Sequence, residues 1–150
     1  KLFELFADDS RIFSLIFVDL DHFKQLNDKH GHLLGDKVLQ AVGKVLSQCM
    51  PETASVARYG GEEFVVLLEE GIEPAANLAE GIRKQLEKIC LRSKKDSGHV
   101  NTVTASFGVA QRVPDEFPDQ LIERADEALY HAKASGRNRV ERERHGVAAA

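Results

Sequence analysis

Runs of apolar residues, and the spacing within them, divide the chain into predicted strands and helices. The first long run, residues 12–18, is β-branched and aromatic, which is typical of a strand buried on both faces. Two apolar residues three positions apart predict a short helix over residues 22–29. Apolar residues at helical spacing then predict a long helix over residues 33–50, which Pro51 ends because the residue before a proline resists helical geometry.

A hairpin is predicted after this helix. Residues 53–58 and 63–69 have the composition of two short strands, and Gly60-Gly61 between them suits a tight turn that needs positive φ. The remaining predicted elements are the tail of an amphipathic helix over residues 1–7, a helix over 75–91, a polar loop over 93–99, a strand over 100–113, a helix over 119–134, an edge strand over 139–143 and a frayed tail over 146–150.

The order of these elements, β-α-α-β-β-α-β-α-β, mixes a hairpin with helical crossovers. It predicts an α+β fold with a central, mostly antiparallel sheet flanked by helices, around a ferredoxin-like βααββαβ core. The chain has 150 residues, of which 43% are apolar and 29% charged, and this suits one globular domain that buries a core. Residues 1–145 are predicted to form that domain.

The charge and the apolar runs exclude some functions. A net charge of −4 and a pI near 5.9 argue against a duplex nucleic-acid binder, which usually presents a basic face to the phosphates. No apolar run approaches the ~18 residues that span a bilayer, and the first residues resemble no signal peptide. Cys49 and Cys90 lie in helical patterns without ligand spacing, so we expect reduced core residues and a cytoplasmic location.

The chain starts at Lys1, and its only methionine is Met50. We therefore expect it to be a piece cut from a longer protein, one that carries a regulatory domain and that a membrane segment could anchor with this domain on the cytoplasmic side.

Two acidic features suggest chemistry. Asp19 follows a buried strand, and Glu62 follows the glycine pair of the hairpin. If that strand lies beside the hairpin, the two carboxylates meet at one end of the sheet. Mg²⁺ usually takes one or two protein carboxylates and completes its shell with water and substrate phosphates. The pair therefore predicts a metal and triphosphate site.

Simpler explanations exist for each feature taken alone. Asp21 precedes a predicted helix and is interpreted as its N-cap, and Asp19 could have a similar structural role. A Gly-Gly pair between strands is most often only a turn, and Glu62-Glu63 could be solvated charges. The histidines form no ligand spacing and are interpreted as surface residues: His22, His30, His99 and His131.

Three motifs in order decide between these interpretations. The hairpin reads Gly60-Gly61-Glu62-Glu63-Phe64 after Arg58-Tyr59, residues 19–36 read D-L-D-H-F-K-Q-L-N-D-K-H-G-H-L-L-G-D, and residues 125–138 read A-D-E-A-L-Y-H-A-K-A-S-G-R-N. From residue 1 to about residue 140 the chain resembles the GGDEF family of diguanylate cyclase domains, in its GGEEF variant. The resemblance implies a nucleotidyl-cyclase or palm-like version of the predicted fold.

The resemblance also implies a metal site and a catalytic group. In the family Mg²⁺, for which Mn²⁺ can substitute, is held by the positions that are here Asp19, the carbonyl of Leu20, and Glu62. Glu62 or Glu63 is implied to help deprotonate a 3′-hydroxyl, a choice that the sequence leaves open. Lys24 matches a cation that offsets triphosphate charge and stabilises the transition state.

The nucleotide contacts are implied in the same way. Asn27 and Asp36 match the residues that read guanine, because a carboxylate accepting from N1–H and N2–H would leave buried groups unpaired against adenine. His32 lies beside them in the motif. The implied phosphate contacts are Lys133, Arg137 and the close backbone approach at Gly60 and Gly61.

The family's reaction joins two GTP molecules into cyclic di-GMP and releases two pyrophosphates. Each domain holds one GTP, so the resemblance implies a homodimer for turnover, an isolated domain that is monomeric and weakly active, and no nucleic-acid or membrane contact. Two rival functions remain: a GTP-sensing module without turnover, and a dimerisation scaffold.

Two family features are missing. The inhibitory R-x-x-D motif falls on Pro51-Glu52-Thr53-Ala54, which has neither the arginine nor the aspartate. We therefore expect no high-affinity cyclic di-GMP binding at that surface. The D-x-L-T-x-L-x-N-R stretch is also absent, and its loss is expected to loosen the triphosphate end of the site.

Overall fold

The computed structural model describes residues 7, 8, 10–92 and 100–144. The predicted helix tail over residues 1–7 lies outside these residues except for its last position, and the polar loop over 93–99 and the tail over 146–150 lie wholly outside them.

A five-stranded sheet forms the centre of the fold, in the order β2-β3-β1-β6-β7. Its strands are β1 (Ser14–Leu20), β2 (Ala54–Arg58), β3 (Glu63–Leu68), β6 (Ala105–Gln111) and β7 (Val140–Arg142). β1 is the middle strand and runs antiparallel to β3 and β6, while only β7 pairs in parallel, with β6. The predicted α+β class, the mostly antiparallel sheet and the edge strand are confirmed.

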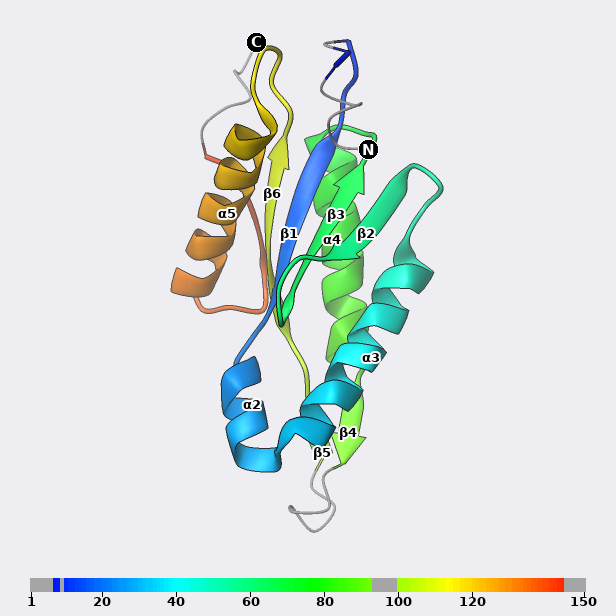
Figure 1. Ribbon diagram of the computed structural model, residues 1–150, viewed down its shortest axis with the longest axis vertical. Helices are drawn as coiled ribbons and strands as arrows, with labels where there is room; N and C mark the ends of the chain where they lie inside the picture. The colour runs from blue at the N-terminus through cyan, green and yellow to red at the C-terminus, as the bar shows by residue number, and fades with distance from the viewer. Residues whose placement is uncertain (1–6, 9, 93–99, 145–150) are drawn as a thin grey trace.

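Helices cover both faces of this sheet (Figure 1). α3 (His32–Cys49) and α4 (Ile72–Glu87) pack on one face, and α5 (Pro118–Ala134) packs on the other. The short helix α2 (Phe23–His30) lies beyond the end of β1. None of the helices that the structure describes is long and apolar enough to cross a membrane.

The continuous apolar run of β1 is explained by burial on both sides. Ile16 and Val18 point into the core shared with α3 and α4, whereas Leu15 and Phe17 point into the core shared with α5. Successive side chains on a strand alternate between faces, so a strand covered on both faces needs apolar residues at almost every position.

The structure corrects two predicted boundaries. α4 starts three residues before the predicted residue 75 and ends at Glu87, and Cys90–Arg92 form strand β4 rather than its last turn. β4 pairs antiparallel with β5 (Val100–Thr102) in a separate two-stranded sheet, so the predicted strand over 100–113 is divided into β5 and β6. Pairing between segments that are apart in sequence overrides the local helical pattern here.

The two cysteines follow the prediction only in part. Cys49 is free and only partly buried, at the end of α3 against the edge of the core. Cys90 is the first residue of β4 rather than part of a helix.

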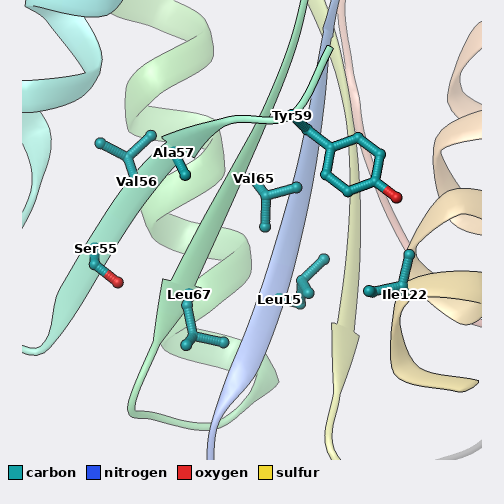
Figure 2. A pocket seen from close by; sticks show the side chains of 8 residues that line it. All are labelled: Leu15, Ser55, Val56, Ala57, Tyr59, Val65, Leu67 and Ile122. Atoms are coloured by element: carbon teal, nitrogen blue, oxygen red, sulfur yellow. The ribbon is translucent and has the colours of Figure 1, made fainter. Parts of the chain in front are cut away.

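An apolar groove of about 250 Å³ lies on the α5 side of the sheet, where β2 and β3 extend past that helix. Figure 2 shows its lining: Leu15, Ser55, Val56, Ala57, Tyr59, Val65, Leu67 and Ile122. Because almost all of these side chains are apolar, the groove does not suit a triphosphate, and the charged site lies elsewhere on this face.

Candidate active site

Asp19 is a buried carboxylate in the middle strand of the sheet. It is 6% exposed and lies opposite Glu63 of β3 and Ser106 of β6 in the strand register. It follows the alternation of Leu15 and Phe17, so it faces α5. Burying a carboxylate is unfavourable unless a positive charge or hydrogen-bond donors compensate for lost water.

Lys133 supplies part of that compensation. It projects from the last turn of α5, and its Nζ donates a charge-assisted hydrogen bond to Asp19 Oδ2. The pair joins positions 114 residues apart in the sequence. The structure therefore brings together two of the predicted site residues from different motifs.

Glu62 lies beside the end of β1. The main-chain N–H of Leu20 donates to the carbonyl of Glu62 at 3.2 Å, which fixes the hairpin loop against the strand. Burial raises the pKa of the Glu62 carboxyl above its ordinary value, and the charge of Asp19 raises it further, while Lys133 partly offsets both effects. The predicted meeting of the two carboxylates at one end of the sheet is confirmed by this geometry.

Glu63 shares this environment. Burial is again the largest cause that raises its pKa, followed by the charge of Asp19, with Lys133 acting in the opposite direction. Smaller contributions that raise the pKa come from Asp126 on α5 and from Glu62. Three carboxylates crowded around one lysine favour a further cation.

The donor set fits a hard divalent cation. Within the described parts of the chain, no group of three or more His, Cys, Asp or Glu side chains is arranged so that it could hold a metal ion by itself. Asp19 and Glu62 offer two carboxylates. The carbonyl of Leu20, the residue after Asp19, would add a main-chain oxygen. Mg²⁺ suits such a partial set because it keeps other positions for water and phosphate oxygens.

The hairpin loop differs from the predicted tight turn. It covers the four residues between Arg58 and Glu63, and neither Gly60 nor Gly61 has positive φ. A longer loop can close without left-handed residues. The Arg58 guanidinium donates to the carbonyls of Gly60 and Gly61 at 3.1 and 2.6 Å, so Arg58 shapes the loop from within.

Packing within the protein also does not demand glycine at position 61. A Cβ built on Gly61 would meet no atom within 4 Å. A Cβ on Gly60 would lie 3.0 Å from the Glu63 carboxylate. The backbone of Gly61 is therefore open to close approach by a ligand.

A second predicted pair lies at the α2–α3 junction. The side chain of Asn27 packs so closely on Gly35 that a Cβ there would lie 1.8 Å from Asn27 Oδ1. This oxygen is buried, and no group within the described residues donates to it. Asp36 follows Gly35 and lines a hollow of about 290 Å³ with Leu39, Gln40, Arg58 and Phe64. An unsatisfied acceptor packed on Gly35 and an exposed carboxylate at the next residue both suit a ligand that supplies N–H groups.

Three of the predicted site residues are exposed or partly exposed. Lys24 is exposed on α2, His32 is exposed at the first position of α3, and Arg137 is partly exposed just after α5. Within the described residues, no ion pair joins Lys24 or Arg137 to the carboxylates.

The N-cap interpretation of Asp21 is wrong. α2 has His22 at its N-cap position without a side-chain cap, whereas the Asp21 carboxylate accepts from Thr104 Oγ1, Ser106 Oγ and the Asn138 N–H. These donors come from segments far along the chain, so a local pattern could not reveal them.

The surface assignment of the histidines is partly wrong. His30 is 7% exposed, because it ends α2 against the neighbouring helix and β5–β6 connection. His22 is exposed and His131 is partly exposed, while His99 lies outside the described residues.

Comparisons with known proteins identify the family of the chain. The family model described as "Diguanylate cyclase, GGDEF domain" matches residues 2–139. The chain is 41% identical over 128 residues to diguanylate cyclase VdcA of Vibrio cholerae and 43% identical over 129 residues to diguanylate cyclase A of Treponema denticola. These matches cover 85% of this chain but only 38% and 34% of those proteins, so the chain spans little more than a third of their length.

Solved structures show the same likeness. The GGDEF domain of DgcB from Caulobacter crescentus, in complex with c-di-GMP, is 36% identical with a TM-score of 0.83, over 89% of this chain and 78% of that one. The active GGEEF domain of a Vibrio cholerae diguanylate cyclase is 30% identical with a TM-score of 0.80, over 95% and 96% of the two chains. The diguanylate cyclase SiaD of Pseudomonas aeruginosa, solved with its activator SiaC, is 32% identical with a TM-score of 0.87, over 94% and 55%. With a match over almost its whole length, this chain belongs to the GGDEF domain family of diguanylate cyclases.

Proposed function

We propose that the chain is the catalytic domain of a diguanylate cyclase, which condenses two GTP molecules into cyclic di-GMP and releases two pyrophosphates. The observation that carries the proposal is the group formed by Asp19, Glu62 and Lys133 at one end of the sheet, where burial and mutual repulsion raise the glutamate pKa. The relatives named as diguanylate cyclases support the activity.

Mg²⁺ is the metal we propose for this site. Asp19, the Leu20 carbonyl and Glu62 would hold it. When bound, the ion would polarise the α-phosphate and acidify the attacking 3′-hydroxyl.

The chain's own residues would bind and orient one GTP. Asn27 and Asp36 would read the guanine, because the buried Oδ1 of Asn27 lacks a donor that a base could supply. Lys133, Arg137 and Lys24 would contact the triphosphate, and the open backbone at Gly61 would lie beside it. His32, at the start of α3, would flank the same nucleotide.

The reaction forms one bond and breaks one at each phosphorus. The 3′-oxygen of one GTP bonds to the α-phosphorus of the other, and the bond to the bridging oxygen of the leaving pyrophosphate breaks. Glu62 or Glu63 would accept the 3′-hydroxyl proton, a role that a raised pKa favours. The lysines and the arginine would stabilise the charge that develops on pyrophosphate.

One domain holds only one GTP, so turnover requires two domains facing each other. We infer that the active form is a homodimer, assembled by a regulatory domain outside this chain. Because GTP is an intracellular nucleotide, we place the reaction in the cytoplasm.

The test uses the chain fused to a dimerising coiled coil, incubated with GTP and Mg²⁺, with product identified by mass spectrometry. We expect cyclic di-GMP from the native chain and from the control Glu127→Gln, whose side chain is exposed on α5. We expect almost none from Glu62→Gln or Asp19→Asn. GTP binding without product would instead indicate a sensor, and no binding would indicate a scaffold.

A further inference from the structure

Asp21 joins the end of β1 to two distant segments of the chain. Its Oδ1 accepts from Ser106 Oγ at 2.6 Å, and its Oδ2 accepts from Thr104 Oγ1 at 2.7 Å and from the Asn138 N–H at 2.9 Å. Its own N–H donates to the Thr104 carbonyl at 2.9 Å. Asp21 therefore ties the strand that carries Asp19 to β6 and to the turn after α5.

That turn has an unfavourable backbone. Arg137 and Asn138 have φ values of 65° and 44°, and Gly136 before them has 118°. The left-handed region is unfavourable for a non-glycine residue, so it persists where surrounding contacts determine it.

The contacts at Asn138 are of that kind. Its side-chain oxygen accepts from Arg83 Nη1 at 3.1 Å, and its side-chain nitrogen donates to Glu87 Oε2 at 2.7 Å. The N–H of Arg137 donates back to the Ala132 carbonyl at 3.0 Å. Among the contacts that the structure describes at this turn, the bond to Asp21 is the one that reaches the residue directly after β1, the strand that holds Asp19 and Leu20.

We propose that Asp21 is a positioning residue, which holds the turn after α5 so that Arg137 faces the triphosphate. This inference rests on the proposed function, because it concerns the same nucleotide site. Asp21 itself touches neither nucleotide nor metal in this scheme. Its bond to the Asn138 N–H holds the backbone of the turn, and this sets the direction of the neighbouring Arg137.

The alternative is that Asp21 only stabilises the fold. The two roles differ in how its effect depends on Arg137. If Asp21 acts through Arg137, the two substitutions will be strongly non-additive in nucleotide affinity, whereas a purely structural effect will add to the loss of Arg137.

The test is a double-mutant cycle read by calorimetry with 3′-deoxy-GTP and Mg²⁺, a probe that lacks the attacking hydroxyl. Asp21→Asn keeps the size but loses the charge-assisted bonds, and we expect it to weaken binding about tenfold. In an Arg137→Ala background we expect the same change to weaken binding less than about twofold. Asp119→Asn, an exposed carboxylate in the first turn of α5, is the control and should leave affinity unchanged.

Amide hydrogen exchange gives a readout that is independent of activity. We expect the Asn138 amide to exchange faster in Asp21→Asn, with the circular dichroism spectrum retained. If Asp21→Asn does not fold, Ser106→Ala removes one donor to the same carboxylate, and we expect about a threefold loss of affinity that again disappears without Arg137.

An unchanged affinity in Asp21→Asn, or an equal loss with and without Arg137, would overturn the inference while leaving the proposed function intact. A native chain that binds no 3′-deoxy-GTP would overturn both. Binding by the native chain without cyclic di-GMP formation from GTP would remove the proposed activity but leave the positioning role to be decided by the cycle itself.

Discussion

The carboxylates of Asp19, Glu62 and Glu63 crowd around one lysine at the end of β1. Burial and the charge of Asp19 raise the pKa of both glutamates, while Lys133 lowers it. The chain therefore keeps an arrangement that costs stability when the glutamates are ionised and no further cation is bound. Carboxylates whose pKa values are raised by burial and by neighbouring negative charge are typical of functional sites.

We expect Glu62→Gln to be more stable than the native chain at neutral pH. Glu62 holds its proton to a higher pH when folded than its ordinary value of 4.5 allows. The contribution of Glu62 to native stability therefore falls as the pH rises from 4.5 through its folded pKa, and the advantage of the glutamine should vanish below about pH 4. Urea unfolding at both pH values measures this, and an equal difference at both would contradict it.

With Mg²⁺ and GTP bound, the native chain should become more stable than Glu62→Gln. A ligand that binds only the folded chain raises its stability, so we expect the midpoint of thermal unfolding to rise with Mg²⁺ and GTP in the native chain and much less in Glu62→Gln. The control is Glu127→Gln, which should respond like the native chain.

Gly35→Ala should impair nucleotide binding with little change in stability. The new Cβ would lie 1.8 Å from Asn27 Oδ1, so the Asn27 side chain must move, and it is the movable end of a side chain rather than backbone. We expect GTP affinity to fall at least about tenfold because guanine groups lose a partner. Gly43→Ala, in the same helix with no atom within 4 Å, should bind normally and gain ~0.5–1 kcal/mol of stability.

At the scale of elements, the site depends on how α5 packs across β6 and β1. Gly108 of β6 lets the backbone of α5 approach closely, since a Cβ there would lie 2.2 Å from the Ala125 carbonyl and 2.3 Å from the Leu129 nitrogen. This close packing places the last turn of α5, with Lys133, at the end of the sheet where Asp19 lies (Figure 1).

Gly108→Ala should therefore destabilise the fold and the site together. Backbone atoms cannot move aside as a side chain can, so we expect a loss of about 2–3 kcal/mol or more in the free energy of unfolding. GTP turnover should fall because Lys133 shifts with its helix. Gly81→Ala, on α4 with open space around it, is the control. Native-like stability in Gly108→Ala would show that α5 is not closely packed there.

At the scale of the whole molecule, the proposed half-site predicts how activity depends on concentration. Two chains must meet for each turnover, so we expect specific activity with GTP and Mg²⁺ to rise steeply with enzyme concentration in the isolated chain. The coiled-coil fusion should show almost no such dependence. A constant specific activity of the isolated chain across a dilution series would argue against a half-site.

The missing inhibitory motif gives a second prediction at this scale. Pro51, Glu52 and Thr53 are exposed before β2, and they offer no arginine to a phosphate. We expect calorimetry to find no submicromolar binding of cyclic di-GMP at this surface. Submicromolar binding that Glu52→Ala abolishes would contradict this.

Much of the fold follows from local patterns. The periods of apolar residues predicted β1, α3 and α5 to within a few residues, because each of these elements buries a face that its own spacing defines. The order of elements then predicted the α+β class. The predicted end of α4 was wrong because residues 90–92 fit a helical repeat but pair with β5. A local pattern contains no information about that pairing.

The sequence by itself determined which residues make up the candidate site, since the three motifs carry the carboxylates, the amide and the cations at recognisable spacing. Only the tertiary structure decided which of them meet. The Lys133–Asp19 pair spans 114 residues and the Asn138–Asp21 bond spans 117, and His30 is buried by elements that lie outside its own helix. Such contacts depend on the order of strands in the sheet and on the packing of α5 across it, and the spacing of residues along the chain does not record either.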